Sequence, residues 1–164
     1  MKRLIPQPLT TSAFAPFGDL IEVPNDAGIQ INAGSAIRHD DLSRADTHHE
    51  QGETGLSLFV AQPRALPITL TMLERHPLGS QAFMPLDGQA FIVVVAPTLS
   101  NGQAGEPVAF FAQAEQGINF ARGVWHHPLI ALASAGRFLV VDRIGPGDNL
   151  ETIQMEPRTL DLSS

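Results

Sequence analysis

Short apolar segments alternate with polar breaks along most of this chain. Within the segments, apolar side chains recur at every second position or form β-branched runs, a pattern that favours strands over helices. The segments that fit are Asp19–Val23, Gly55–Ala61, Ile68–Glu74, Gln81–Pro85, Phe91–Ala96, Pro107–Phe111, Leu129–Ala133 and Arg137–Asp142. One short helix is predicted over Thr11–Phe17, since Phe14 and Phe17 share a helical face and Gly18 follows as a stop.

The breaks contain most of the 14 glycines and 13 prolines, which are spread along the chain rather than gathered in a linker. Many short strands joined by turns are typical of an all-β domain, and Asn101-Gly102 is expected at the tip of one loop. We therefore predict a single all-β domain over residues 1–164 with a minor helix. The pattern alone leaves a sandwich, a jelly roll or a closed barrel.

Composition narrows the classes of function. The chain has 10 basic and 17 acidic residues, a net charge of −7, and its basic residues are scattered, which argues against nucleic acid as a partner. There is no cysteine, which excludes disulfides and thiolate chemistry. The apolar run Phe91–Pro97 is too short to span a membrane, and prolines interrupt the N-terminus before any signal-peptide core. We expect a cytoplasmic protein with no membrane partner.

Two polar clusters interrupt the apolar pattern where strands begin or end. Glu74 and His76 stand two apart at the end of one strand, so their side chains are expected on the same face, and Gln81 begins the next strand after a turn. His126 and His127 come directly before another strand, and strand alternation predicts that only one of them enters the barrel. Imidazole binds divalent metals and titrates near neutral pH, so both clusters are candidate sites.

These residues also carry a resemblance to known sequences. The spacing of Gly117, Gly123 and His126 matches the second cupin motif. The residues Glu74, His76, Gln81 and Gly88 resemble the first cupin motif. A closer similarity is to the ureidoglycolate lyase family, whose blocks occur here in family order. They are Phe17–Ile21, Ile31–Gly34 with Arg38, Glu74–Gly79, Gln81–Phe83, Phe91–Val95, Glu115–Asn119, Val124–Leu129 and Val141–Arg143.

The resemblance implies a cupin-like double-stranded β-helix, or jelly-roll barrel, that forms a homodimer and acts in allantoin and purine nitrogen breakdown. The activity it implies is a carbon–nitrogen lyase that converts (S)-ureidoglycolate to glyoxylate and urea. A divalent ion, Ni²⁺ by family resemblance, would be held by Glu74, His76, Gln81 and His126. Glu74 and Gln81 stand where the usual cupin set has a histidine and a glutamate.

Such a lyase needs a base near the hydroxyl, an acid near the leaving nitrogen and a cation for the carboxylate. His76 or His126 is the expected base, and Glu74 is expected to be the acid or to orient a histidine. The expected substrate contacts are Arg38 or Arg143 for the carboxylate, whose shape a guanidinium matches, and Asn32 and Gln81 for the urea or hydroxyl group.

Other interpretations remain open at this stage. The two histidines can be buried structural residues, Asn32 a turn residue, and Asp142 and Arg143 a surface ion pair. The chain can also be a cupin that binds a small acid without catalysis, or an amidohydrolase that releases ammonia. Covalent hydrolysis has little support, because the chain lacks cysteine and any Gly-x-Ser-x-Gly motif.

Overall fold

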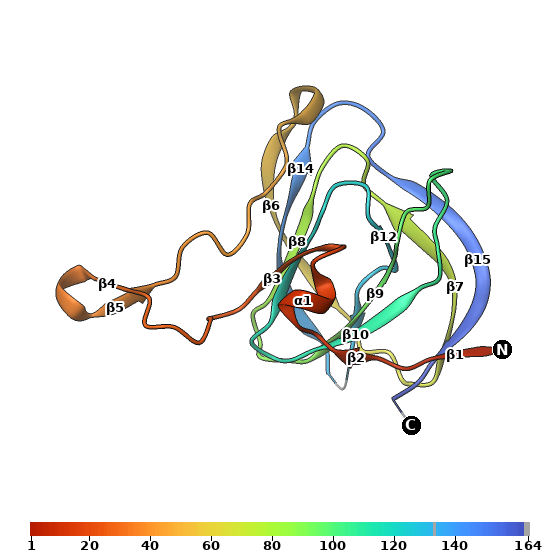
Figure 1. Cartoon of the computed structure of the whole chain (residues 1–164), viewed down its shortest axis with the longest axis horizontal. Helices are drawn as coiled ribbons and strands as arrows, with labels where there is room; N and C mark the ends of the chain where they lie inside the picture. The colour runs from red at the N-terminus through yellow and green to blue at the C-terminus, as the bar shows by residue number, and fades with distance from the viewer. Residues whose placement is uncertain (133, 163–164) are drawn as a thin grey trace.

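A computed structural model describes residues 1–132 and 134–162. The chain forms two curled sheets that face each other, with a projecting two-stranded hairpin to one side (Figure 1). The eight-stranded sheet contains, in spatial order, β1 (Lys2–Leu4), β15 (Glu151–Leu160), β7 (Ile68–Arg75), β12 (Trp125–His126), β9 (Phe91–Ala96), β10 (Val108–Ala112) and β2 (Gln7–Pro8), with β13 (Ile130–Ala131) paired to β9. Its curl and the facing sheet make the cupin-like all-β barrel that the family resemblance implies.

The second sheet has five antiparallel strands and forms the opposite wall. In spatial order these are β3 (Gly18–Ile21), β11 (Gly117–Phe120), β8 (Gln81–Pro85), β14 (Gly136–Ile144) and β6 (Glu53–Ala61). The hairpin is built from β4 (Ile29–Ile31), a 3₁₀ turn η1 (Asn32–Gly34) and β5 (Ala36–Arg38), and a second 3₁₀ turn, η2, spans His49–Gln51. Within the described residues, no helix has the length and apolar character needed to cross a membrane.

Every strand predicted from the sequence is present, although several bounds move by a few residues. β8 and β9 have the predicted bounds, whereas the predicted helix is shorter, because α1 spans Thr11–Phe14 and is followed by a turn. The Thr10 hydroxyl caps this helix by accepting a hydrogen bond from the Ala13 backbone N–H at 3.2 Å. The strand predicted over Leu129–Ala133 and the domain predicted over 1–164 each include positions outside the described residues.

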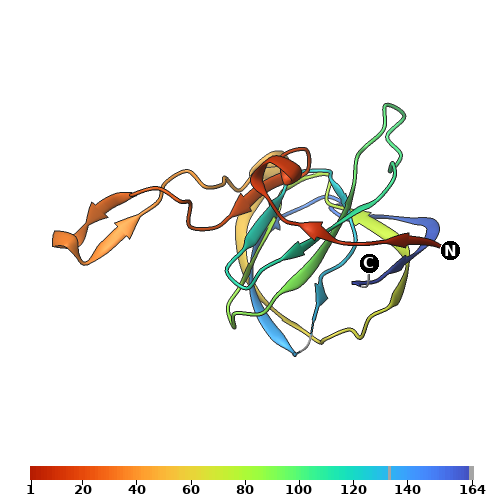
Figure 2. The same ribbon diagram turned by 60° about the horizontal axis from the view of Figure 1, so that its bottom comes forward.

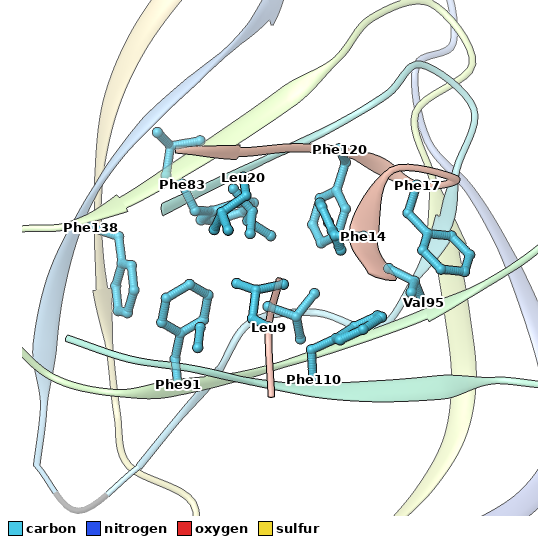
Figure 3. Close-up of a cluster of buried hydrophobic side chains, with 14 residues drawn as sticks. Leu9, Phe14, Phe17, Leu20, Phe83, Phe91, Val95, Phe110, Phe120 and Phe138 are labelled. Atoms are coloured by element: carbon cyan, nitrogen blue, oxygen red, sulfur yellow. The ribbon is translucent and has the colours of Figure 1, made fainter. Parts of the chain in front are cut away.

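The barrel interior is apolar and rich in phenylalanine. Phe91, Val93 and Val95 of β9 point into the space between the sheets, where Phe91 meets Phe138 of β14 edge-on at 5.2 Å between ring centroids. Figure 3 shows these rings converging with Phe14 from the helix and with Phe110 from β10, the strand beside β9. The alternate residues of β9 face a second apolar cluster that includes Leu70 and Leu160, enclosed by the curl of the eight-stranded sheet. A strand buried on both faces explains the continuous apolar run.

Candidate active site

An open cavity of about 490 Å³ lies between the two sheets. Most of its wall is apolar, and its polar side chains are Glu74, His76, Gln81, His126 and His127. A small set of convergent polar groups in an apolar cavity is the usual form of a small-molecule site. The cavity wall therefore contains both polar clusters that the sequence analysis singled out.

Strand pairing brings these side chains together. Glu74 of β7 lies directly opposite His126 of β12 in antiparallel register, and residues paired in this way point to the same face of the sheet. His76 follows the end of β7, where its carbonyl accepts a hydrogen bond from the Gly123 backbone N–H at 2.9 Å. The His76 and His126 ring centroids are 5.2 Å apart.

The hydrogen bonds of His76 define the state of its ring. Its Nδ1 lies 2.7 Å from the backbone carbonyl oxygen of Asn149, which can only accept, so Nδ1 carries a proton. Its Nε2 lies 3.1 Å from Oε1 of Gln81, another acceptor, and the Gln81 amide nitrogen donates to Asp142 Oδ2 at 3.2 Å. With the amide held in this orientation, Nε2 must either donate a proton or share a cation with Gln81.

His126 has the complementary arrangement. Its Nδ1 donates to the Val124 carbonyl oxygen at 2.9 Å, so in a neutral ring Nε2 has no proton and presents a lone pair. This buried Nε2 has no hydrogen-bond partner among the described residues, and the nearest Glu74 carboxylate oxygen is 3.6 Å away. Phe120 stacks on the ring at 4.2 Å between centroids and 15° between planes, which fixes its orientation.

Electrostatics keep Glu74 ionised and disfavour a charge on His127. The pKa of Glu74 is lowered, first by its interaction with His126 and also by the charges of His76 and His127, which outweigh the effect of burial. The pKa of His127 is lowered, chiefly by burial, with the charge of Arg64 acting in the same direction. The site thus contains a carboxylate among imidazoles in a partly desolvated space.

The same groups fit a divalent ion. One ligand atom from each of Glu74, His76 and His126 lies within 4.8 Å of the others, and Gln81 Oε1 faces His76 Nε2. Both imidazoles donate Nδ1–H to backbone carbonyls, as metal-bound histidines commonly do, which leaves Nε2 for a cation. The unpartnered Nε2 of His126 is the observation that favours this fit. Glu74, His76 and His126 form a potential metal-binding triad.

The structure does not bring the three other sequence-predicted contacts to this cavity. Asn32 and Arg38 lie on the projecting hairpin, where Arg38 Nε pairs with Asp40 at 2.9 Å. Arg143 is buried and donates from Nε to the His49 carbonyl and from Nη2 to the carbonyls of Glu50 and Pro146, each at 2.8 Å. Its guanidinium holds the η2 loop to the end of β14.

One geometric expectation was wrong, and several site groups were missed. Both His126 and His127 line the cavity, because β12 ends at His126 and strand alternation no longer applies to the next residue. Asp142, which orients Gln81, shares the strand parity of buried Phe138 and Val140, and this signal could have placed it on the inner face. The Asn149 carbonyl gave no signal, because any residue supplies a backbone acceptor.

Two histidines and a carboxylate face one cavity of this β-barrel. His126 presents a lone pair to that cavity and His76 presents a ring nitrogen, which is the arrangement of a small-molecule enzyme site. The chain belongs to the ureidoglycolate lyase family, since the family model described as Ureidoglycolate lyase matches residues 1–161. It is 53% identical to the "Ureidoglycolate lyase" of Burkholderia mallei (strain NCTC 10229) over 92% of this chain and 88% of that protein.

Two further relatives have similar coverage. The "Ureidoglycolate lyase" of Rhodobacter capsulatus is 52% identical over 92% of both chains, and "Ureidoglycolate lyase 2" of Rhizobium meliloti is 50% identical over 88% of both.

Among solved structures, RmlC from Streptococcus suis in complex with dTDP-D-xylose matches 58% of this chain and 46% of its own, with 12% identity and a TM-score of 0.45.

Proposed function

We propose that this protein is a carbon–nitrogen lyase that converts (S)-ureidoglycolate to glyoxylate and urea. Membership of the family supports the reaction, and one observation in the site carries the chemistry. His126 presents a buried lone pair to the same cavity in which the His76 hydrogen bonds favour a ring that donates from Nε2. The reaction needs one proton removed and one proton supplied, and the two rings are suited to opposite tasks.

In the first task, His126 Nε2 accepts the proton of the carbinol hydroxyl. The O–H electron pair then forms the carbonyl of glyoxylate as the bond from carbon to the ureido nitrogen breaks. The Val124 carbonyl holds Nδ1–H and fixes the ring. The carboxylate of Glu74, 3.6 Å from Nε2, stabilises the imidazolium that results.

In the second task, His76 supplies a proton from Nε2 to the departing nitrogen, so that urea leaves as a neutral molecule. The Asn149 carbonyl retains the Nδ1 proton, and Gln81, anchored by Asp142, aims its oxygen at the donating edge. No water is consumed. Proton exchange between the two rings, whose centroids are 5.2 Å apart, restores the starting state.

We also propose that the site holds a divalent ion, Ni²⁺ by family resemblance. Glu74, His76, Gln81 and His126 would be its ligands. A bound ion of this kind acts as a Lewis acid that makes a hydroxyl more acidic. A histidine whose lone pair binds the ion is not a free base, so metal removal tests which role the ring has.

The cellular context is a further part of the proposal. The family resemblance supports a homodimer in the cytoplasm that acts in allantoin and purine nitrogen breakdown. The net charge of −7 and the scattered basic residues support a small-molecule substrate over nucleic acid.

The test follows urea, glyoxylate and ammonia release from racemic ureidoglycolate, before and after chelation, with nickel or manganese added back. Equal amounts of urea and glyoxylate support the lyase, whereas ammonia indicates an amidohydrolase. Tight binding of glyoxylate or oxalate without turnover indicates a binding protein and would refute the proposal. Activity that is lost on chelation and recovered with metal assigns the ligands, whereas full activity after verified removal leaves the histidines as direct acid and base.

A matched pair of variants tests the base. His126→Asn should lower kcat by roughly 10²- to 10⁴-fold, the usual contribution of a general base. His48→Asn, in an exposed loop, should leave kcat unchanged. Equal activity of the two variants would exclude His126 from the chemistry.

A further inference from the structure

The projecting hairpin is the largest feature of the structure that the proposed reaction leaves unexplained. We name residues 22–45 the arm; it contains β4, η1 and β5, which pair only with each other in a two-stranded sheet. Figures 1 and 2 show the arm extending away from the barrel. Its exposed apolar side chains include Val23, Ile29 and Ile37, which are 78%, 49% and 62% exposed. A lone two-stranded hairpin is marginal in water, so the arm needs a surface to pack on.

The outer face of the five-stranded sheet provides an apolar surface. Leu58, Leu139 and Met84 lie side by side across β6, β14 and β8, and the next row contains Leu56, Val141 and Ala82. Leu56, Leu58 and Val60 are 73%, 62% and 65% exposed. An antiparallel sheet with one face in water normally places polar side chains on that face. This sheet is apolar on both faces, and its last strand, β6, has an open edge.

The base of the arm is fixed to this same outer face. Asn119 of β11 lies opposite Ala82 in register and therefore in the row that contains Leu56. Its amide nitrogen donates to the Ser43 hydroxyl at 2.9 Å and to the Arg44 carbonyl at 3.0 Å. A second protein chain that covered the apolar rows would therefore lie against the base of the arm.

The cavity lacks one component that the proposed substrate needs. Among the described residues that line it there is no arginine or lysine to hold a carboxylate. The cavity reaches the surface beside β6, because Val60 of β6 and Leu150, both exposed, are part of its lining. Asn32 and Arg38 are on the arm, and among the described residues neither makes a hydrogen bond or ion pair to a residue that lines the cavity.

We infer that two copies of the chain pack through the outer faces of their five-stranded sheets, and that the arm of each copy supplies Arg38 to the substrate carboxylate in the other copy's cavity. This rests on the proposed function for the identity of the ligand. The chemistry is a guanidinium meeting a carboxylate in a cavity whose described lining contains no arginine or lysine.

The dimensions of the arm agree with this arrangement. A two-fold axis parallel to the strands places β3 of one copy, where the arm begins, over β6 of the other, where the cavity opens. The sheet is about 19 Å wide, from four spacings of about 4.8 Å between its strands. The extended limb from Val23 to Asn32 reaches about 30 Å at ~3.3 Å per residue. The arm is therefore long enough to pass the partner's edge strand.

Arg64 is the competing cation within the same chain. It is exposed, and its charge acts on His127 of the cavity wall. If Arg64 held the substrate carboxylate, Arg64→Ala would raise KM and Arg38→Ala would not. The inference requires the opposite order, with a KM increase of about tenfold or more for Arg38→Ala, equivalent to about 1.4 kcal/mol of lost binding.

Mixing two weakened variants separates an arm that acts on its own chain from one that acts on the partner. Arg38→Ala and His126→Asn are unfolded, mixed in equal amounts and refolded. The assay uses substrate well below the wild-type KM, where Arg38→Ala alone keeps about a tenth of wild-type activity or less. A mixed dimer has one site with both residues intact if the arm crosses over, so the mixture should reach about a quarter of wild-type activity, because half the dimers are mixed and half of their sites are complete. No recovery in a mixture shown by mass spectrometry to contain mixed dimers would overturn the inference.

A second experiment does not depend on catalysis. The chain has no cysteine, so Ser35→Cys at the arm can be labelled uniquely with a benzophenone in a mixture of ¹⁴N and ¹⁵N protein. Cross-links to the segment around Leu150 should join light and heavy chains. If the protein shows no turnover but forms these cross-links, the proposed function is refuted, whereas the inference that the arm reaches the partner is supported. Cross-links confined to one chain would refute that inference.

The packing surface has its own control. Leu58→Asp places a charge in the centre of the apolar rows and should convert the protein to a monomer in sedimentation or light scattering. Leu99→Asp changes an exposed loop leucine elsewhere, 46% exposed, and should leave the assembly unchanged. A wild-type monomer, or a dimer that Leu58→Asp does not weaken, would exclude this face as the interface.

Discussion

Replacing Arg143 by methionine tests whether this residue is structural or binds substrate. Methionine keeps much of the apolar stem but removes the guanidinium, which donates to the carbonyls of His49, Glu50 and Pro146. Hydrogen bonds to a charged group are worth about 1.5–3 kcal/mol each. The side chains of the η2 loop are exposed, so its carbonyls can rehydrate in the variant. We expect a total loss of about 3 kcal/mol in the free energy of unfolding.

For a chain of this size, that loss lowers Tm by about 6–12 °C. Urea unfolding followed by Trp125 fluorescence gives the free energy, and steady-state assays well below Tm give KM. We expect the KM for ureidoglycolate to stay within about twofold of wild type, a change of less than ~0.5 kcal/mol. Unchanged stability together with a tenfold or greater rise in KM (about 1.4 kcal/mol) would show that Arg143 contacts the substrate and that its role is not structural.

Three further predictions concern the site and its support. The difference in unfolding free energy between metal-free wild type and Glu74→Gln should shrink as the pH falls below 4.5, because a lowered carboxylate pKa stabilises the fold until the group is protonated; urea titrations across acid pH test this, and a constant difference into strong acid would contradict it. Phe120→Leu removes the ring stacked on His126 and should lower kcat by about 2- to 10-fold with little change in KM, from ~0.5–1.5 kcal/mol of aromatic contact; an unchanged kcat would show that the stack does not position the base. Gly79→Ala places a methyl group 2.6 Å from Arg143 Cβ and should lower the unfolding free energy by about 1–3 kcal/mol, measured by urea denaturation, whereas an unaffected protein would mean that β14 shifts freely.

The sequence predicted the strands whose side-chain pattern follows burial directly. β8 alternates between buried and partly buried residues, and β9 is buried on both faces, so their bounds could be read from periodicity. β15 escaped prediction although it is the longest strand in the described residues, because Pro157 and a register shift between Gln154 and Arg158 break its alternation. The arm strands are only three residues each and carry little core pattern.

The site was partly predictable for similar reasons. Glu74 and His76 lie in one cavity because a spacing of two places residues on one face, and the turn before Gln81 returns the chain to it. Residue type alone could not show whether Arg143 is structural or binds substrate, although its strand parity is opposite to that of inward-facing Asp142. The location of Arg38 on the arm depends on tertiary structure, which local periodicity does not encode.

The site also bears on how the protein folds, since its hydrogen bonds join segments that are far apart in sequence. His76 is bound to the carbonyl of Asn149, 73 positions along the chain, and His126 is paired in register with Glu74. Contacts of such long sequence separation require large loops to close and slow folding. No local fragment can therefore contain a working site, and recovery of activity during refolding should lag behind early strand formation and report the moment when the whole barrel has closed.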